Sequence, residues 1–365
     1  MHLLSSSRPR LVIAAATGAV LALTLTACGS DGGGGTDDKP LIGVILPDSA
    51  SSDRWETADR KYLEAAFEAA GVDYDIQNAQ GSREDFQTIA DQMLTKGADV
   101  LVTVNLDSGT GKTVIEKAKS QGVATIDYDR LTEDGGADYY VSFDNEQVGV
   151  LQGEGLVSCL EGVEKPLIAE LNGSPTDNNA TLFKNGYDSV LDPLYADGTF
   201  EKGPDESVPD WDNAQGGTLF EQMLTDTGTQ VDGVLAANDG LAHAVITVLE
   251  RNNLNGTVPV TGQDATVQGL QNILTGDQCM TVYKAVEQEA NAAADLAVAL
   301  ANGEKPETEA SVTDPVSGAE VPSVLLEPVA ITIENIQDVV DDGYADPAEL
   351  CAGEYAALCT EHGIG

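Results

Sequence analysis

The sequence predicts an α/β fold with two doubly wound lobes, each built on a parallel sheet. Three observations support this prediction. Short apolar runs alternate with segments of helical periodicity, glycines stand where the helices should end, and the alternation starts again after a loop at residues 131–140. Such alternation is typical of βαβ units, which form parallel sheets. A chain of 365 residues can also supply two domains that each bury a core.

The first series of elements lies between Leu41 and Ile126. Its predicted strands are short runs rich in apolar and β-branched residues, at 41–46, around Ile76, at 100–104 and at 124–126. Its predicted helices have apolar residues three or four positions apart, at 57–70, 86–94 and 114–118. A glycine follows each helix, as expected of a left-handed C-cap. Strand, helix and glycine therefore recur in the order of a βαβ series.

The second series follows the loop at residues 131–140. The same criteria predict strands at 167–169, 231–236, 258–260 and 280–283. They predict helices at 147–160, 180–191, 219–224, 242–249 and 285–301, the last of which is rich in alanine. A second α/β lobe of similar size is the simplest structure that fits this order.

Residues 1–27 have the pattern of a bacterial lipoprotein signal peptide. Arg8 and Arg10 precede an uncharged apolar stretch, which ends in Leu-Thr-Ala-Cys at residues 25–28. Cleavage before Cys28 would make that cysteine the lipid-carrying first residue. The alternative, a transmembrane anchor, is disfavoured because the stretch is shorter than the ~20 residues that span a bilayer. Residues 28–39, rich in Gly, Ser and Asp, are expected to form a flexible tether.

Four further cysteines follow, namely Cys159, Cys279, Cys351 and Cys359. An even number in an exported chain predicts up to two disulfides, and the sequence leaves all three connectivities open. Cys351 and Cys359 can pair only if the chain bends near Gly353, because one continuous helix would hold them ~12 Å apart.

Composition and the absence of motifs argue against several classes of function. With 18 Lys and Arg against 61 Asp and Glu, the formal charge of −43 disfavours any nucleic-acid partner. The apolar content of 42% argues against disorder. No CxxC motif or histidine cluster indicates a metal site, and no GxSxG or HExxH motif indicates a catalytic one. The Gly-Thr-Gly-Lys-Thr sequence at 109–113 lacks the first glycine of a phosphate loop, so no cofactor is predicted.

The candidate binding residues lie at strand ends and in two polar loops. Ligands of open parallel sheets bind at the carboxyl ends of the strands, and there the chain carries Asp, Asn, Arg and Lys. Its two tryptophans, Trp55 and Trp211, both stand in polar loops. A tryptophan in such a loop either plugs a core or covers a ligand with its flat face. A sugar ring has an apolar face of C–H groups and an equator of hydroxyls, which indoles and charged side chains match.

Seven short stretches together resemble one family. They are Asp53-Arg54-Trp55, Tyr128-Asp129-Arg130, residues 141–146, residues 173–180, Ala237-Asn238-Asp239, residues 262–265 and residues 281–284. Over about residues 41–345 the chain resembles the periplasmic-type sugar-binding proteins of ABC importers, which have the ribose/galactose-type fold. Within this family it is most similar to the D-xylose-binding subfamily. The resemblance implies a type I periplasmic-binding-protein fold, in which three strands form a hinge between two lobes.

The resemblance also implies a monosaccharide site between the lobes. Trp55 and Trp211 would sandwich the pyranose ring. The other implied sugar-binding residues are Arg54, Asp129, Arg130, Asp177, Asn179, Lys184, Asn238, Asp264 and Lys284. Lys184 replaces an arginine of the xylose-binding proteins, Asn105-Leu106-Asp107 replaces Pro-Tyr-Asn, and the loop before Arg54 is one residue longer. These departures bear on which sugar is bound, not on the class of ligand.

Three crossings between the lobes are implied as well, after Arg130, after Lys284 and before Leu325. The first lobe would comprise residues 40–130 and 285–322, and the second would comprise residues 131–284 and 323–365. This division places all four cysteines beyond the lipidated one in the second lobe.

The expected function is that of a monomeric, lipid-anchored receptor on the outer face of a bacterial membrane. It would capture D-xylose or a related aldopyranose and deliver it to an ABC permease. The lobes would close by hinge bending, with no bond made or broken. Two alternatives stay open: a receptor that passes the sugar signal to a membrane sensor, and a carbohydrate-active enzyme with two poised carboxylates. A neighbouring permease would favour import over sensing, and product formation would indicate an enzyme.

Overall fold

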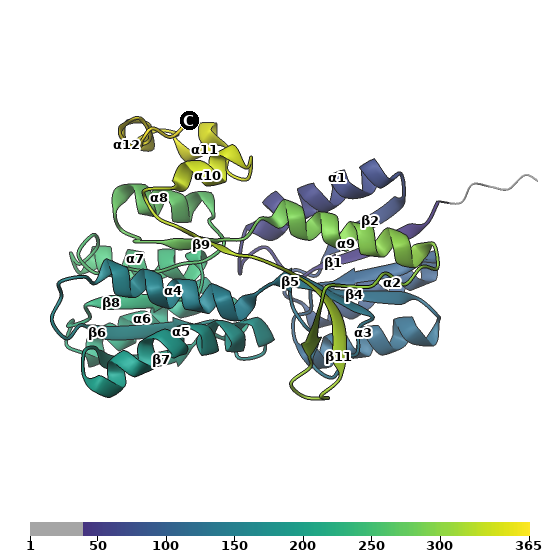
Figure 1. Cartoon of the computed structure of the whole chain (residues 1–365), viewed down its shortest axis with the longest axis horizontal. Helices are drawn as coiled ribbons and strands as arrows, with labels where there is room; N and C mark the ends of the chain where they lie inside the picture. The colour runs from purple at the N-terminus through teal and green to yellow at the C-terminus, as the bar shows by residue number, and fades with distance from the viewer. Residues whose placement is uncertain (1–38) are drawn as a thin grey trace, which may run out of the picture. The chain divides into compact units, whose positions relative to one another are not determined.

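The computed structural model of the protein describes residues 39–365 (Figure 1). The predicted signal peptide, Cys28 and the predicted tether up to Asp38 lie outside the described residues. Residues 39–365 form one compact unit. Within these residues, none of the helices combines the length and the hydropathy that crossing a membrane requires.

A seven-stranded sheet forms the centre of the first lobe. Its strand order is β10-β11-β5-β4-β3-β1-β2, and every neighbouring pair is parallel except β10 with β11. The strands are β1 (Leu41–Leu46), β2 (Asp73–Asn78), β3 (Val100–Thr103), β4 (Ala124–Tyr128), β5 (Tyr139–Phe143), β10 (Ala310–Thr313) and β11 (Glu320–Leu326). Ile42 and Val44 of β1 pack in one apolar cluster and Ile45 in another, because neighbouring side chains of a strand point to opposite faces. Both faces of the sheet are therefore covered.

Two pairs of helices provide this cover. α1 (Arg60–Ala70) and α9 (Val286–Ala301) pack on the face with Ile42 and lie side by side in Figure 1. α2 (Arg83–Lys96) and α3 (Ser108–Ser120) pack on the face with Ile45. Gly71 and Gly97 end α1 and α2 in the left-handed conformation, as the sequence predicts.

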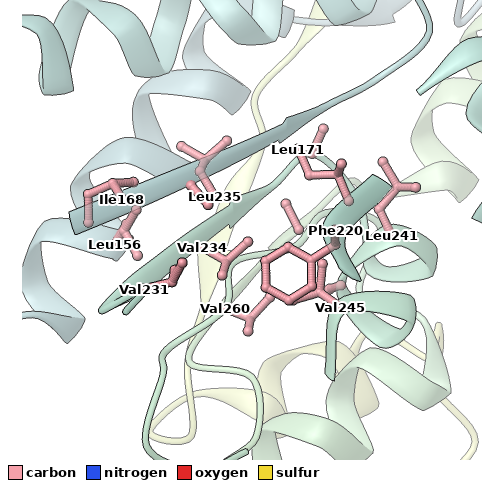
Figure 2. Packing of buried hydrophobic residues seen from close by; sticks show 14 of the residues in the cluster. Leu156, Ile168, Leu171, Phe220, Val231, Val234, Leu235, Leu241, Val245 and Val260 are labelled. Atoms are coloured by element: carbon pink, nitrogen blue, oxygen red, sulfur yellow. The ribbon is translucent and has the colours of Figure 1, made fainter. Parts of the chain in front are cut away.

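The second lobe has a smaller sheet with the order β7-β6-β8, and both pairs of strands are parallel. Its strands are β6 (Leu167–Asn172), β7 (Glu201–Ser207) and β8 (Gly233–Ala236), and its helices are α4 (Asn145–Cys159), α5 (Asn178–Asp197), α6 (Asn213–Asp226) and α7 (Asp239–Arg251). Figure 2 shows Ile168 and Leu171 of β6 in one buried cluster with Val234 of β8 and Phe220 of α6. This core fixes the carboxyl ends of β6 and β8, where the site residues begin.

The remaining elements connect the lobes or follow them. β9 (Thr281–Tyr283) pairs antiparallel with β12 (Val329–Ile331). α8 (Val267–Thr275) packs against α11 (Pro347–Leu350) and α12 (Tyr355–His362), and α10 (Ile336–Asp341) belongs to the same apolar cluster (Figure 1). Two short turns carry the tryptophans: η1 (Trp55–Asp59) before α1, and η2 (Pro209–Trp211) before α6.

The predicted α/β fold class is confirmed, and several elements differ from the prediction or were not predicted. The strand predicted at 258–260 is wrong, because only Val260 forms a bridge, to Val234. β7 was not predicted, because its polar sequence, Glu-Lys-Gly-Pro-Asp-Glu-Ser, lacks the apolar pattern of a strand. The strand lies at an exposed edge of its sheet, where such a pattern is not required. The C-terminal helices α10 to α12 were not predicted either, because each is too short to show helical periodicity.

The first sheet extends farther along the chain than the predicted first lobe. β5 pairs with β4, and β11 pairs with β5, whereas the predicted division places residues 131–143 and 323–326 in the second lobe. The chain turns back after residue 130 and adds β5 to the same sheet before it leaves the lobe. We therefore propose that the lobes divide between β5 and α4, between β9 and α9, and between β11 and β12.

Two disulfides use the four described cysteines. Cys159 at the end of α4 pairs with Cys279, and Cys351 pairs with Cys359. The second pair has the chain bend that it needs, because Gly353 takes a φ of 63° between α11 and α12.

Candidate functional site

A small, mostly polar cavity, with about 20 Å³ open to a water-sized sphere, lies between the two lobes, at the carboxyl ends of their strands. Its first-lobe walls come from the loop before η1 and the residues after β4. Its other walls come from the start of α5, η2, Asn238 before α7, the two residues 263–264 before α8, and Lys284 after β9. All predicted sugar-binding residues except Lys184 line it: Arg54, Trp55, Asp129, Arg130, Asp177, Asn179, Trp211, Asn238, Asp264 and Lys284.

Arg54 forms the centre of a buried ionic network on the first-lobe side. Its Nε and Nη2 donate to the two carboxylate oxygens of Asp59 at 2.9 and 2.8 Å. Nη2 also donates to Glu289 at 3.1 Å, and Nη1 to Asp129 at 3.1 Å. The side chain is 1% exposed. Burial lowers its pKa, but Asp59 and Asp129 outweigh this and raise it, so the guanidinium stays charged. It lies 4.4 Å from the ring centre of Trp55.

Asp129 presents an ionised carboxylate to the cavity. Its φ of 61° is in the left-handed region, which turns the chain sharply after β4. Asn179 Nδ2 donates to its carbonyl at 2.8 Å and to Oδ1 at 3.2 Å, and Lys284 Nζ lies 3.4 Å from Oδ2. Burial raises its pKa, but the charges of Lys284, Arg54 and Arg130 outweigh burial and lower it to about 2. This carboxylate can therefore accept hydrogen bonds from hydroxyl donors.

Asp264 is the corresponding carboxylate of the second lobe. Its Oδ2 accepts from Ser52 Oγ at 3.0 Å, across the lobes, and its Oδ1 lies 3.3 Å from Lys284 Nζ. Oδ1 accepts no hydrogen bond from the described residues, and neither does Oε1 of the neighbouring Gln263. Buried acceptors normally have donors. These two oxygens are therefore suited to a ligand that brings hydroxyl groups.

Two indole rings line the same cavity, one from each lobe. Trp55 Nε1 donates to Ser51 Oγ at 3.2 Å, and Trp211 Nε1 donates to Asp177 Oδ2 at 3.0 Å. Both tryptophans are nearly buried: the exposed fraction is 3% for Trp55 and 5% for Trp211. Each indole N–H is satisfied by the protein, so the flat faces are what they offer to a ligand.

Lys184 is the predicted site residue that the structure does not bring to the cavity. Its Nζ lies 2.9 Å from Glu170 and 3.0 Å from Asp205, in an ionic group on the side of β6. The preceding residue, Phe183, does line the cavity. Neighbouring positions on a helix point about 100° apart. Lys184 therefore faces away from the site, and its assignment as a sugar contact is corrected.

Four lining residues were missed by sequence reasoning: Ser51, Ser52, Phe183 and Gln263. Gln263 is one of the polar strand-end residues after the apolar run at 258–260, but only its neighbour Asp264 was predicted to bind the sugar. The serines sit in a polar loop with no distinguishing pattern. Among residues 39–365, no three His, Cys, Asp or Glu side chains are grouped to hold a metal ion.

Direct contacts between the lobes surround the cavity. Asn238 Nδ2 donates to Ser51 O at 3.2 Å, and Asn213 Nδ2 donates to Ala50 O at 3.0 Å. Arg130 Nε pairs with Asp177 at 3.0 Å. A polar cavity with charged acceptors, charged donors and two aromatic faces, enclosed between two α/β lobes, defines a two-lobed binding protein for a small polar solute.

Comparison with known proteins identifies the family. The model of the periplasmic binding protein domain matches residues 42–305, so the chain belongs to this family. It is 35% identical over 310 residues to the D-xylose-binding periplasmic protein of Escherichia coli strain K12, covering 85% of this chain and 92% of the relative. It is 34% identical to the multiple sugar-binding periplasmic receptor ChvE of Rhizobium radiobacter, covering 86% and 93%. The family resemblance predicted from the sequence is confirmed.

Solved structures agree with this assignment and confirm the type I fold. A carbohydrate transporter solute-binding protein from Chloroflexus aurantiacus, in complex with D-glucose, has a TM-score of 0.77 and 30% identity, covering 84% of this chain and 97% of that one. An ABC transporter solute-binding protein from Clostridium phytofermentans, with bound β-D-glucose, has a TM-score of 0.78 and 28% identity, covering 85% and 99%.

Proposed function

We propose that the protein is the sugar receptor of a bacterial ABC importer and that its ligand is an aldopyranose, D-xylose or a close relative. The observation that carries the proposal is the cavity itself. It combines the indoles of Trp55 and Trp211 with the carboxylates of Asp129 and Asp264. One buried oxygen of Asp264 accepts no hydrogen bond from the described residues. A pyranose supplies both an apolar face for the indoles and hydroxyl donors for the carboxylates.

We propose that residues near Arg130 influence which sugar is bound. Asn105 Nδ2 donates to Arg130 O at 3.2 Å, and Arg130 Nη1 donates to Asn105 O at 3.2 Å. We therefore propose that the departure at residues 105–107 from the xylose-binding proteins affects the position of Arg130 in the cavity. D-xylose is the first candidate because relatives at about one-third identity are named for it.

Calorimetric titration with D-xylose, D-glucose, D-galactose, L-arabinose and D-ribose tests the proposal. We expect one of these aldopyranoses to bind with a Kd of about 1 μM or below, which corresponds to about 8 kcal/mol. Folded protein that binds none of them below about 1 mM would contradict the proposal, because that limit is only about 4 kcal/mol.

Anchoring and delivery are further parts of the proposal. We propose that Cys28 carries the lipid, that the receptor stands on the outer face of the membrane as a monomer, and that an ABC permease accepts its sugar. Labelling of cells with a radioactive fatty acid should mark the wild-type chain and not a Cys28→Ala variant. Equal labelling of the two would contradict the anchor while leaving the sugar site untouched.

A further inference from the structure

The carboxylate of Asp264 faces the cavity from a backbone conformation that needs support. Its φ of 99° and the φ of 49° at Ala265 are both positive, a region in which residues other than glycine are uncommon. Such conformations persist where neighbouring groups fix them. Asp264 N donates to Val282 O at 2.8 Å, and Ala265 N donates to Thr281 Oγ1 at 3.2 Å. β9 thus holds the two N–H groups of this turn but not the carbonyl of Asp264.

Tyr344, in the turn after α10, holds that carbonyl. Its hydroxyl donates a hydrogen bond of 3.0 Å to Asp264 O. Its ring packs against the ring of Tyr283 in β9, with the ring centres 5.1 Å apart. The donor therefore belongs to a rigid, packed side chain, which makes it an effective support for a peptide group.

The C-terminal segment of residues 336–364 keeps Tyr344 in this place. Ile336 and Leu350 of the segment are fully buried in one cluster with Leu270 of α8. The disulfide Cys351–Cys359 joins α11 to α12 within the segment. α8 begins three residues after Asp264. The C-terminal segment therefore packs on the helix that directly follows this site residue.

The same turn also contacts the first lobe. The hydroxyl of Tyr62, on α1, donates to Gly343 O at 3.3 Å. Tyr344 itself packs against the apolar cluster of the first lobe that contains Tyr62. Positions 343 and 344 therefore touch both lobes and the backbone of a residue that lines the cavity.

We propose that Tyr344 is a positioning residue of the sugar site, whose hydroxyl fixes the Asp264 peptide and thereby the direction in which the Asp264 carboxylate meets a sugar hydroxyl. The proposal rests on the sugar-binding function proposed above. Without this hydrogen bond the peptide gains freedom, and the carboxylate has to be ordered when the sugar binds. The loss is then in sugar affinity rather than in the stability of the unliganded fold.

Tyr344→Phe tests this role, because it removes the hydroxyl and keeps the ring. We expect the Kd for the bound aldopyranose to rise about five- to tenfold, the worth of one neutral hydrogen bond. The thermal midpoint of the unliganded protein should change by less than about 2 °C. Tyr355→Phe is the matched control, since it removes a hydroxyl from the same segment without touching Asp264. It should leave the Kd within about twofold of wild type.

Wild-type protein is titrated first, and this separates the two proposals. If wild type binds no aldopyranose, the proposed function is wrong and the positioning role falls with it. If wild type binds and Tyr344→Phe binds equally well, only the positioning role is wrong. A lowered thermal midpoint with an unchanged Kd, or an equal loss of affinity in Tyr355→Phe, would likewise overturn it, because either result makes Tyr344 merely structural.

Discussion

Arg54 and Glu289 lie 235 positions apart in the chain, yet Arg54 Nη2 donates a hydrogen bond of 3.1 Å to Glu289 Oε2. Glu289 is on α9, which enters the first lobe after β9. The helix thus places the buried carboxyl group of Glu289 against Arg54, which itself lines the cavity. Burial, with the charges of Asp129 and Asp59, raises the pKa of Glu289 well above its usual value, and Arg54 opposes this rise.

The first prediction concerns the loss of Arg54. Arg54→Leu leaves Asp59, Asp129 and Glu289 buried without their shared cation. We expect the free energy of unfolding to fall by about 3–5 kcal/mol. The control is Arg60→Leu, whose ion pair with Glu56 is partly exposed and is expected to contribute about 1 kcal/mol or less. Urea unfolding measures both, and equal losses would contradict the role of burial.

The second prediction concerns the space for Trp211. Gly173 has no side chain because a Cβ there would collide with the six-membered ring of Trp211. Gly173→Ala should displace the indole and raise the Kd for the sugar about tenfold or more. The control is Gly217→Ala, where the new Cβ would lie 3.6 Å from Ala244 in ordinary contact. An unchanged Kd in Gly173→Ala would show that the position of Trp211 does not matter for binding.

The third prediction concerns pH. Burial raises the pKa of Asp127 to about 7, and burial with the Asp264 charge raises that of Asp239 to about 7. Between the usual value of 3.8 and about 7, the folded protein binds more protons at these groups than the unfolded chain does. The free energy of unfolding therefore falls as the pH rises through this window. Asp129, whose pKa is lowered to about 2, acts in the opposite sense only below about pH 4.

Thermal unfolding between about pH 5 and about pH 8 checks this sign. The midpoint should fall with rising pH, and the dependence should be shallower in Asp127→Asn, which removes one of the two groups. A midpoint that rises across the window would contradict the assignment.

The fourth prediction concerns the disulfides. The Cys159–Cys279 bridge closes a loop with a sequence separation of 120, and Cys351–Cys359 one of 8. Loop-closure entropy gives losses of about 5 and about 2.5 kcal/mol when each pair is replaced by serines. Urea unfolding of the two double variants should reproduce this order. Both cysteines of the longer loop lie in the second lobe, so the folded Cys159→Ser/Cys279→Ser variant should bind the sugar as wild type does.

Part of the site could be predicted because the ends of buried strands can be recognised in the sequence, where an apolar run gives way to polar residues. Asp129, Asn238 and Asp264 follow apolar runs, and the rule that ligands bind at carboxyl ends of parallel strands selects them. Lys184 shows the limit of a family comparison, because one step along a helix separates a lining position from an outward one. Tyr344 could not be found at all, since its contact with Asp264 depends on how short C-terminal helices pack.

Strands could be predicted from the sequence where burial produces a run of apolar residues, and they could not be predicted where no such run occurs. β1 and β3 are buried on both faces and read as continuous apolar runs. β7 is exposed at a sheet edge, and its register is set by pairing with β6 rather than by its own side chains. The pairing of β5 with β4, on which the lobe division proposed above rests, could not be predicted for a similar reason, because it is not a property of either segment alone.

The central claim is that a pyranose binds between Trp55 and Trp211 in the cavity, and paired titrations of wild type and Trp211→Ala with D-xylose test it most directly. Circular dichroism first establishes that both proteins are folded. We expect wild type to bind with a Kd of about 1 μM or below and Trp211→Ala to bind about 100-fold more weakly. Equal affinities in the two proteins would contradict the claim, because the sugar would then bind outside the pair of indoles.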